Sequence, residues 1–563
     1  MSDQKGREIM RLANELRMQR STFERQWQDI LDVLRPQMAP VLGDQSASAL
    51  ATAAGEKRTS KIISSMPPLC AEKHAAVMEA MLSPRNQTWS ALTIGEDDEL
   101  GEDQEVKAYL ETVNRILFKA RYRPGSNLAS QLSESYLSLG LLGTQVLYVG
   151  DDVGRSIMYR SVPIARCLID EDNYGQVNKV LRRYQLNADQ AYREFLSHLP
   201  ESQRAAAAAK FPEPLRTAYN NKNQRKFNFL HAVLPRPIVE DNRYDYRGMP
   251  FASCHVFEDD GSVIREGGFR TMPYCVSRYT KSADELYGRG PGMIVLPEVN
   301  MLYRMGKAVI KGAERVTDPP LMVGDDSLEV FHLRNGAMNY GTLNEQGEPL
   351  VKPFVTGAKL EMGMDLVDDS KATIREAFLL DVFQVLTESP VMTATQVLEI
   401  AKEKAALLAP VMGRQQSELF GPMTTRELDI LTQARLLPEM PEALIERSGD
   451  VSIEYLSPLA LAQRAERGVS ILRTFEAVTP LTATPDGQNA LRVFNIKEAV
   501  RELATVNNFP AKAMRTRQEV EDMDENEAAE LEAQQVLEAA PAVSKSLESM
   551  TKAQANLATG ANV

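Results

Sequence analysis

The stretch LPEVNMLYRMGKAVIKGAERVTDPP, residues 296–320, has the pattern of one long helix with two different sides. At about 100° per residue, one quadrant of this helix contains four cations: Arg304, Lys307, Lys311 and Arg315. The opposite side contains apolar residues: Val299, Leu302, Val309 and Val316. Pro297 is tolerated in a first turn, and the pair Pro319-Pro320 ends the segment because proline cannot continue a helix. The sequence therefore predicts a two-sided helix over Leu296–Val316.

The chain as a whole is acidic. It has 563 residues, of which 43% are hydrophobic and 25% charged, and its formal net charge is −13. This composition is typical of a globular protein, and the length suggests about three or four domains or lobes. A protein that coats nucleic acid by neutralising phosphates needs a basic surplus. A simple DNA-binding surface is therefore not expected, although an acidic protein can guide DNA without adhering to it.

The cysteines and the apolar segments indicate a soluble intracellular protein. Four cysteines lie far apart in the sequence without a C-x-x-C pair, which favours reduced thiols over disulfides or a zinc site: Cys70, Cys167, Cys254 and Cys275. The first twenty residues lack the apolar core of a signal peptide. The stretch Ser135–Gly150 is too short and too polar to span a bilayer. We therefore expect no membrane span.

Motifs of catalysis are missing from the sequence. MGKA at 305–308 lacks the first glycine of a phosphate-binding loop, and Ala308 replaces the hydroxyl that would hold Mg²⁺. The five histidines form no HExxH pattern, and no G-x-S-x-G elbow occurs. We expect a protein that is not an enzyme and that has no cofactor and no metal site.

The periodicity predicts an α+β fold that is mainly helical. Helices are expected up to about residue 35 and over 71–82, 103–120 and 127–139, and strands over 88–94 and 144–150. A mixed α/β lobe over 155–280 contains the strand patterns SIMYRSVPI, KFNFLHAVLPRP, FASCHVFED and GFRTMPYCVSRYTK. After the Leu296–Val316 helix come short strands and turns to about residue 360, and then a helix over 368–386. TESPVMT interrupts the helical pattern around Pro390, and the C-terminal third is helical and acidic.

The order of these motifs resembles the portal, or head-to-tail connector, proteins of short-tailed bacteriophages. The resemblance rests on AEKHAAVMEAMLSPRNQTWSALTI, SLGLLGTQVLYVG, YGRGPGMIVLPEVNMLYRMGKAVIKGAERVTDPPLMV, MTATQVLEIAKEKAALLAPVMGRQQSELFGPM and IEYLSPLALAQRAE. The third stretch is the most specific. It implies a portal-type fold with these parts: wing 1–293, stem helix 294–317, clip 318–362, second stem helix 363–386, tunnel loop 387–394, second wing part 395–470, and crown or barrel with an acidic tail 471–563.

The resemblance also implies a function. Twelve identical subunits would form a ring at one capsid vertex, through which double-stranded DNA passes during packaging and ejection without sequence recognition. The implied partners are terminase, a tail adaptor protein, and the capsid and scaffolding proteins. The implied location is the virion, with the host cytoplasm during assembly. A non-ring helical adaptor or scaffold protein of virion assembly is the alternative.

Two sets of residues are the candidate sites. The resemblance places a DNA-proximal tunnel loop at Glu388, Ser389, Pro390, Val391, Met392 and Thr393. The cationic side of the stem helix has two candidate partners: DNA phosphate in the channel, or an acidic side of the second stem helix formed by Asp365, Asp369 and Glu376. We favour the ion pairs, because cations that grip DNA in every subunit would retard its translocation.

Overall fold

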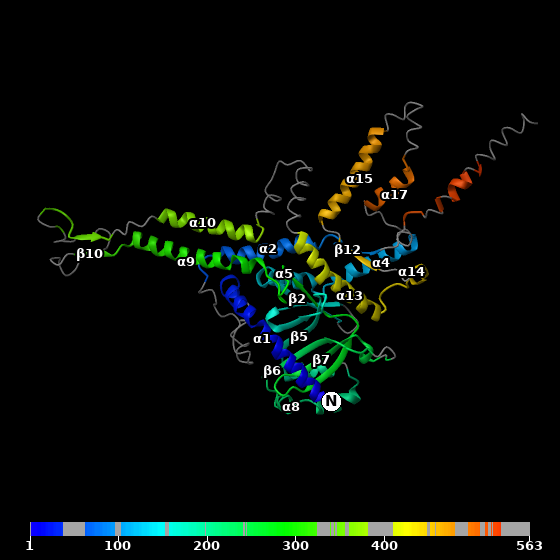
Figure 1. Ribbon diagram of the computed structural model, residues 1–563, viewed down its shortest axis with the longest axis horizontal. Helices are drawn as coiled ribbons and strands as arrows, with labels where there is room; N and C mark the ends of the chain where they lie inside the picture. The colour runs from blue at the N-terminus through cyan, green and yellow to red at the C-terminus, as the bar shows by residue number, and fades with distance from the viewer. Residues whose placement is uncertain are drawn as a thin grey trace, which may run out of the picture. The chain divides into compact units, whose positions relative to one another are not determined.

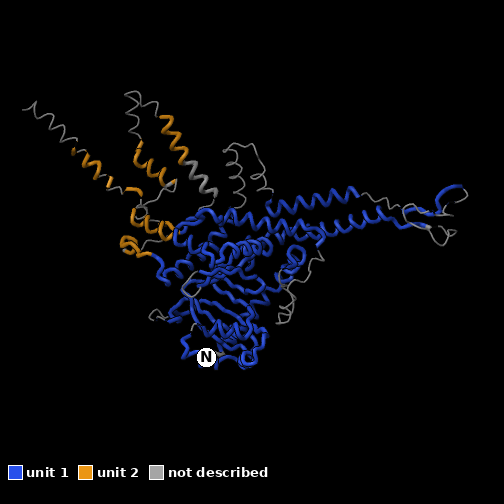
Figure 2. The backbone as a smooth tube through the Cα atoms, turned by 180° about the vertical axis from the view of Figure 1, so that it is seen from behind, with its two compact units in different colours: residues 1–91, 115–437, 453–460 blue, residues 92–114, 438–452, 461–563 orange. Residues whose placement is uncertain are grey.

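The computed structural model describes residues 2–37, 62–95, 103–151, 157–197, 199–239, 243, 245–323, 338, 343, 346–354, 360–380, 409–446, 451–455, 458–478, 494–506, 513–515, 519–520, 522–527 and 529–530. The chain forms two compact units, which Figure 2 shows in different colours. Unit 1 comprises residues 1–91, 115–437 and 453–460, and unit 2 comprises residues 92–114, 438–452 and 461–563.

Three helices form the helical core of unit 1: α1 (Ser2–Leu34), α2 (Met66–Leu82) and α5 (Leu128–Leu142). The Trp27 side chain of α1 is fully buried, and its indole Nε1 donates to the carbonyl of Leu142 over 3.1 Å. Tyr136 of α5 is also fully buried, and its hydroxyl lies 2.9 Å from that of Ser83. These polar contacts let large aromatic side chains enter the core without leaving a donor unpaired.

A three-stranded antiparallel sheet follows α5. Its order is β3 (Ile157–Val162), β2 (Thr144–Asp151) and β9 (Tyr274–Arg278). Gly143, with φ at 72°, ends α5 in the left-handed conformation and turns the chain directly into β2. The central strand β2 is almost entirely buried, so this sheet joins the helical core to the mixed lobe.

The mixed lobe is a five-stranded antiparallel sheet with helices on both faces. Its order is β4 (Cys167–Glu171), β5 (Val177–Asn187), β6 (Lys226–Pro235), β7 (Phe251–Phe257) and β8 (Val263–Phe269). One face packs on α6 (Ala188–Leu196) and α8 (Glu213–Asn220), which are separated by α7 (Glu201–Ala209). The other face packs on α1. The sequence patterns predicted β6 and β7 of this sheet, but not β4, β5 or β8.

Two long helices, α9 (Pro291–Thr317) and α10 (Leu360–Ala377), lie side by side in both views (Figures 1 and 2). Between them, β10 (Leu321–Val323) pairs antiparallel with β11 (Val351–Pro353). The prediction of α9 was right in kind, but the helix begins at Pro291. The prediction for α10 was wrong at both ends: the helix begins at Leu360 and ends at Ala377, because Leu379 adopts a positive φ of 58°.

The segment 409–433 is continuously helical. A π-helical turn, η4 (Gln416–Phe420), leads without interruption into α13 (Gly421–Gln433), whose second residue is Pro422. Proline is tolerated there because its missing N–H is not needed in a first turn.

The remaining elements are α4 (Gln104–Arg121), α14 (Glu442–Glu446), α15 (Pro458–Val478) and α17 (Ile496–Val506), with a two-stranded sheet of β1 (Ser90–Ile94) and β12 (Val451–Tyr455). No helix within the described ranges is long and apolar enough to cross a membrane.

Candidate functional site

The start of α9 is fixed to the helical core by glycines. A Cβ built on Gly290 would lie 2.6 Å from the carbonyl oxygen of Gly140, and one on Gly292 would lie 2.7 Å from that of Leu141. A Cβ on Gly288 would lie 2.3 Å from the carbonyl oxygen of Gly143. Only glycine allows backbones to approach this closely. The YGRGPGM joint is therefore a tight attachment of α9 to α5.

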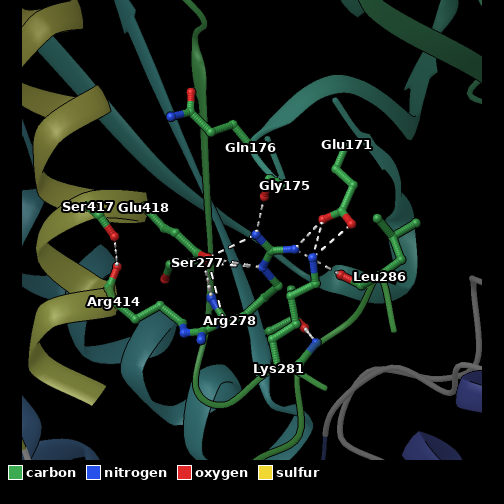
Figure 3. Close-up of polar contacts among 12 residues, drawn as sticks. Glu171, Gly175, Gln176, Ser277, Arg278, Lys281, Leu286, Arg414, Ser417 and Glu418 are labelled. Atoms are coloured by element: carbon green, nitrogen blue, oxygen red, sulfur yellow. Dashed lines mark hydrogen bonds and ion pairs between the residues drawn. The ribbon is translucent and has the colours of Figure 1, made fainter. Parts of the chain in front are cut away.

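A buried ion cluster around Arg278, shown in Figure 3, supports the same attachment. The Arg278 side chain is 2% exposed, and its guanidinium contacts Glu171 at 2.7 Å and Glu418 at 2.8 Å. It also donates to the carbonyls of Gly175 (2.7 Å) and Leu286 (3.3 Å). The cluster thus joins the ends of β4 and β9 to η4 and to the loop before α9.

The charges of this cluster stabilise one another. Burial alone would lower the pKa of Arg278, but its bonds with Glu418 and Glu171 outweigh burial and raise it. Burial alone would raise the pKa of Glu171, but the hydrogen bonds from Lys281 and Arg278 outweigh it and hold that pKa below its ordinary value. Lys281 lies 2.7 Å from Glu171. The arrangement is a satisfied network, which suits a structural joint.

Two further contacts fix the helix pair to the core. The Tyr303 hydroxyl of α9 donates to the carbonyl of Val33 over 2.9 Å. His74 of α2 donates from Nδ1 to the carbonyl of Phe378, just after α10, over 2.9 Å. Burial lowers the pKa of His74, so its imidazole is neutral near pH 7.

Beyond these anchors, α9 and α10 pack through small residues. A Cβ on Gly312 would lie 2.7 Å from the Leu360 side chain, and one on Gly363 would lie 2.8 Å from that of Val309. Rising numbers in α9 thus meet falling numbers in α10, and the pair is antiparallel. Of the apolar side predicted for α9, Val299 and Leu302 are fully buried.

Comparison with known proteins assigns the family of the chain. Residues 6–514 match the family described as bacteriophage head to tail connecting protein. The chain belongs to this family. The resemblance drawn from the sequence is thereby confirmed, together with the mainly helical α+β fold.

Three portal proteins are similar to this connector chain. The probable portal protein of Bordetella phage BPP-1 is 26% identical over 459 residues, covering 80% of this chain and 78% of the relative. The portal protein of Salmonella phage epsilon15 is 22% identical over 563 residues, covering 98% of this chain and 97% of the relative. That of Enterobacteria phage T3 is 21% identical over 435 residues, covering 74% of each.

The predicted cations of this connector lie on an open surface. All four are exposed, and none forms an ion pair or side-chain hydrogen bond with another residue in the ranges the structure describes: Arg304, Lys307, Lys311 and Arg315. They fall on the side of α9 that is turned away from the buried Val299 and Leu302.

The predicted carboxylates also lie in the open. Asp365, Asp369 and Glu376 are exposed, and at about 100° per residue they fall opposite Gly363 and the fully buried Ile374. Because Gly363 packs on Val309, this carboxylate side points away from α9. The expected ion pairs are therefore not formed within one chain.

Apolar side chains are exposed beside these charges. On α9, Ile294 is 71% exposed and Val316 60%, whereas the sequence placed Val316 on the packed side. On α10, Met362 is 63% exposed and Met364 56%. Large exposed apolar side chains are typical of a surface that another protein covers.

Other residues of interest fall elsewhere. The tunnel-loop residues Glu388–Thr393 lie outside the described ranges. Sequence patterns gave no sign of Arg278, whose carboxylate partners are more than a hundred positions away, nor of the buried pair Arg121–Glu427, which is 2.7 Å apart. In the described part of the chain, no group of His, Cys, Asp and Glu side chains is placed to hold a metal ion.

Proposed function

We propose that this connector is the portal subunit of a phage virion. Identical copies, twelve by the family resemblance, assemble as a ring at one capsid vertex and form a conduit for double-stranded DNA in packaging and ejection. The observation that supports this most strongly is the α9–α10 pair. It has cations on one side, carboxylates on the opposite side, and exposed apolar side chains on both helices.

Opposite charges on opposite sides suit a head-to-tail contact between copies. The α9 side of one copy would meet the α10 side of the next, and such a contact closes into a ring when the rotation per copy divides a full turn. Each exposed ion pair contributes only about 0–1 kcal/mol. The apolar side chains supply most of the stabilisation, and the charges set orientation and register.

The role needs no cofactor and no catalytic group from this chain. Terminase supplies the ATP hydrolysis of packaging and docks on the ring, as do a tail adaptor protein and the capsid and scaffolding proteins. Twelve copies with a formal charge of −13 each give 12 × −13 = −156. A ring of this charge repels DNA from most of its surface, which favours sliding over adhesion. The chain would reach the virion from the host cytoplasm.

A charge-reversal experiment tests the contact between copies. The double variant Lys311→Glu, Arg315→Glu should lower the fraction of chain in rings, measured by analytical ultracentrifugation. Adding Asp365→Lys and Asp369→Lys should restore part of it, since coupled neighbours are not additive. A matched control is Arg193→Glu, Lys210→Glu, which makes the same charge change at exposed positions of the mixed lobe.

The outcomes separate the two partners considered for the cations. Rings that form normally from the reversed chain, with DNA packaging alone impaired, would show that the cations face DNA in the channel. An equal fall in the fraction of chain in rings for the reversed chain and for the control would show a general effect of charge. A wild-type chain that forms no ring in negative stain would favour the non-ring adaptor or scaffold.

A further inference from the structure

The five-stranded sheet holds a row of four arginine and histidine residues, one on each of four neighbouring strands. Arg182 of β5 pairs in register with His231 of β6, His231 with His255 of β7, and His255 with Arg265 of β8. All four point to the face that packs on α6, because their neighbours Leu181, Leu230 and Cys254 belong to the core cluster on the α1 face. Figure 1 labels three strands of this sheet, β5, β6 and β7.

The row borders a cavity of about 420 Å³ within unit 1. Arg160 of β3 and Arg426 of α13 also line it, so that four guanidinium groups face one space, with Asp151 and Glu194 at the lining as well. Arg426 is neutralised by Asp429 at 2.8 Å. Arg160 and Arg265 form no ion pair or hydrogen bond with any described residue. The cavity therefore has guanidinium donors that the chain itself does not use.

His231 and His255 form a flat, uncharged surface in the cavity. Their rings stack at a centroid distance of 4.2 Å with an interplanar angle of 1°. Burial lowers the pKa of His231 far below its ordinary value and, with the charges of Arg265 and Arg182, lowers the pKa of His255 to about 3. Tyr274 and Ser253 hold the ring of His231, and Tyr184 holds that of His255. The floor of the cavity is thus a rigid, neutral platform between two arginines.

The dimensions favour an extended anion. Arg182 and Arg265 are three strand spacings apart, which is about 14 Å between backbones, and each side chain can lean inward. Planar guanidinium forks match phosphate oxygens in pairs. We propose that this cavity binds a phosphorylated small molecule, with Arg160, Arg182 and Arg265 contacting its phosphate groups. The site is separate from the α9–α10 surface, and the proposal stands independently of ring assembly.

Titration of the full chain with pyrophosphate, inorganic phosphate and ATP, at constant ionic strength in an isothermal calorimeter, tests the site. Pyrophosphate should bind at one site per chain. The variant Arg160→Gln, Arg265→Gln removes two unpartnered guanidinium groups and should weaken binding at least about tenfold. Tighter binding of ATP than of pyrophosphate would show that the nucleoside is also contacted. Equal binding would show recognition of phosphate alone, and both results support the site.

A second variant tests the cavity without touching its charges. A Cβ at Gly267 would meet only the Cβ of Ser253, at 3.9 Å, so Gly267→Val fits the strand while it narrows the cavity. It should also weaken binding, whereas Arg193→Gln on the exposed side of α6 should not. Equal affinity for pyrophosphate in the wild type, the double arginine variant, Gly267→Val and Arg193→Gln would overturn the proposal. So would the absence of binding heat with pyrophosphate, inorganic phosphate and ATP. A structure of the assembled ring with a carboxylate of a neighbouring copy on Arg265 would also overturn it.

Discussion

Replacing Arg278 by methionine tests whether the buried ion cluster holds α9 to the body of the chain. Methionine fills part of the volume and removes the guanidinium, so that Glu418 loses its three hydrogen bonds from that group and the Glu171 side chain keeps only Lys281. Breaking a fully buried pair costs about 3–5 kcal/mol. Glu171 and Glu418 are 24% and 18% exposed and regain some water. We therefore expect the free energy of unfolding to fall by about 3 kcal/mol, the low end of the range for a buried pair.

Two matched variants separate charge from geometry. Arg278→Lys keeps the charge but cannot reach Glu171, Glu418 and two carbonyls together, and should lose about 2 kcal/mol. Lys281→Met removes one partly exposed pair and should lose about 1 kcal/mol or less. The expected order of the losses, from largest to smallest, is Arg278→Met, Arg278→Lys and Lys281→Met.

Urea unfolding followed by tryptophan fluorescence measures these losses. Both tryptophans of the chain, Trp27 and Trp89, are buried in unit 1, so the signal reports on the unit that contains the cluster. The midpoint should be measured at several protein concentrations, because assembly adds apparent stability. A midpoint for Arg278→Met equal to that of the wild type, or higher than that of Lys281→Met, would refute the structural role of the cluster.

Two further predictions concern acid stability and the tunnel loop. His74 is buried and its pKa is lowered, so below about pH 6.5 the unfolded chain takes up a proton that the folded chain does not, and stability present at pH 7.5 is lost on acidification with a slope of up to about 1.4 kcal/mol per pH unit. His74→Gln should reduce this slope in urea midpoints between pH 7.5 and 5.5, with the buried His231 and His255 supplying the part that remains, and an unchanged slope would contradict the assignment. Deleting Ser389–Met392, predicted from the family resemblance to lie next to DNA, should leave rings intact in negative stain and shorten the DNA retained in particles. Failure of the rings to form would make the segment an architectural connector, and full DNA retention would make it dispensable.

The sequence was sufficient for elements whose pattern is local. The period of α9, its cationic quadrant and its end before Pro319 are all present in one stretch of sequence. Its first residue was placed too late, because Gly290 and Gly292 look like a flexible joint until their contacts with α5 are known. The early end of α10 depends on the left-handed backbone of Leu379. Leucine rarely adopts this conformation, so the sequence did not predict the end of the helix there.

The remaining features depend on contacts between distant parts of the chain. Strand β5 was missed because VNKVLRRYQLN contains charged residues that ordinarily indicate a surface. Arg182 in it faces the sheet neighbour His231 and a cavity instead of bulk water. Likewise, spacing along α10 showed that Asp365, Asp369 and Glu376 share a side, but only the packing of Gly363 on Val309 shows which way that side points.

The central claim is that copies of this connector close into a ring, and the mass of the purified full-length chain tests it most directly. Native mass spectrometry at micromolar concentration, with negative-stain images of the same sample, should give closed rings with an axial hole. Twelve copies of the 62.6 kDa chain would weigh about 750 kDa. A stable 62.6 kDa monomer that forms no ring and does not enter capsid assembly would contradict the claim.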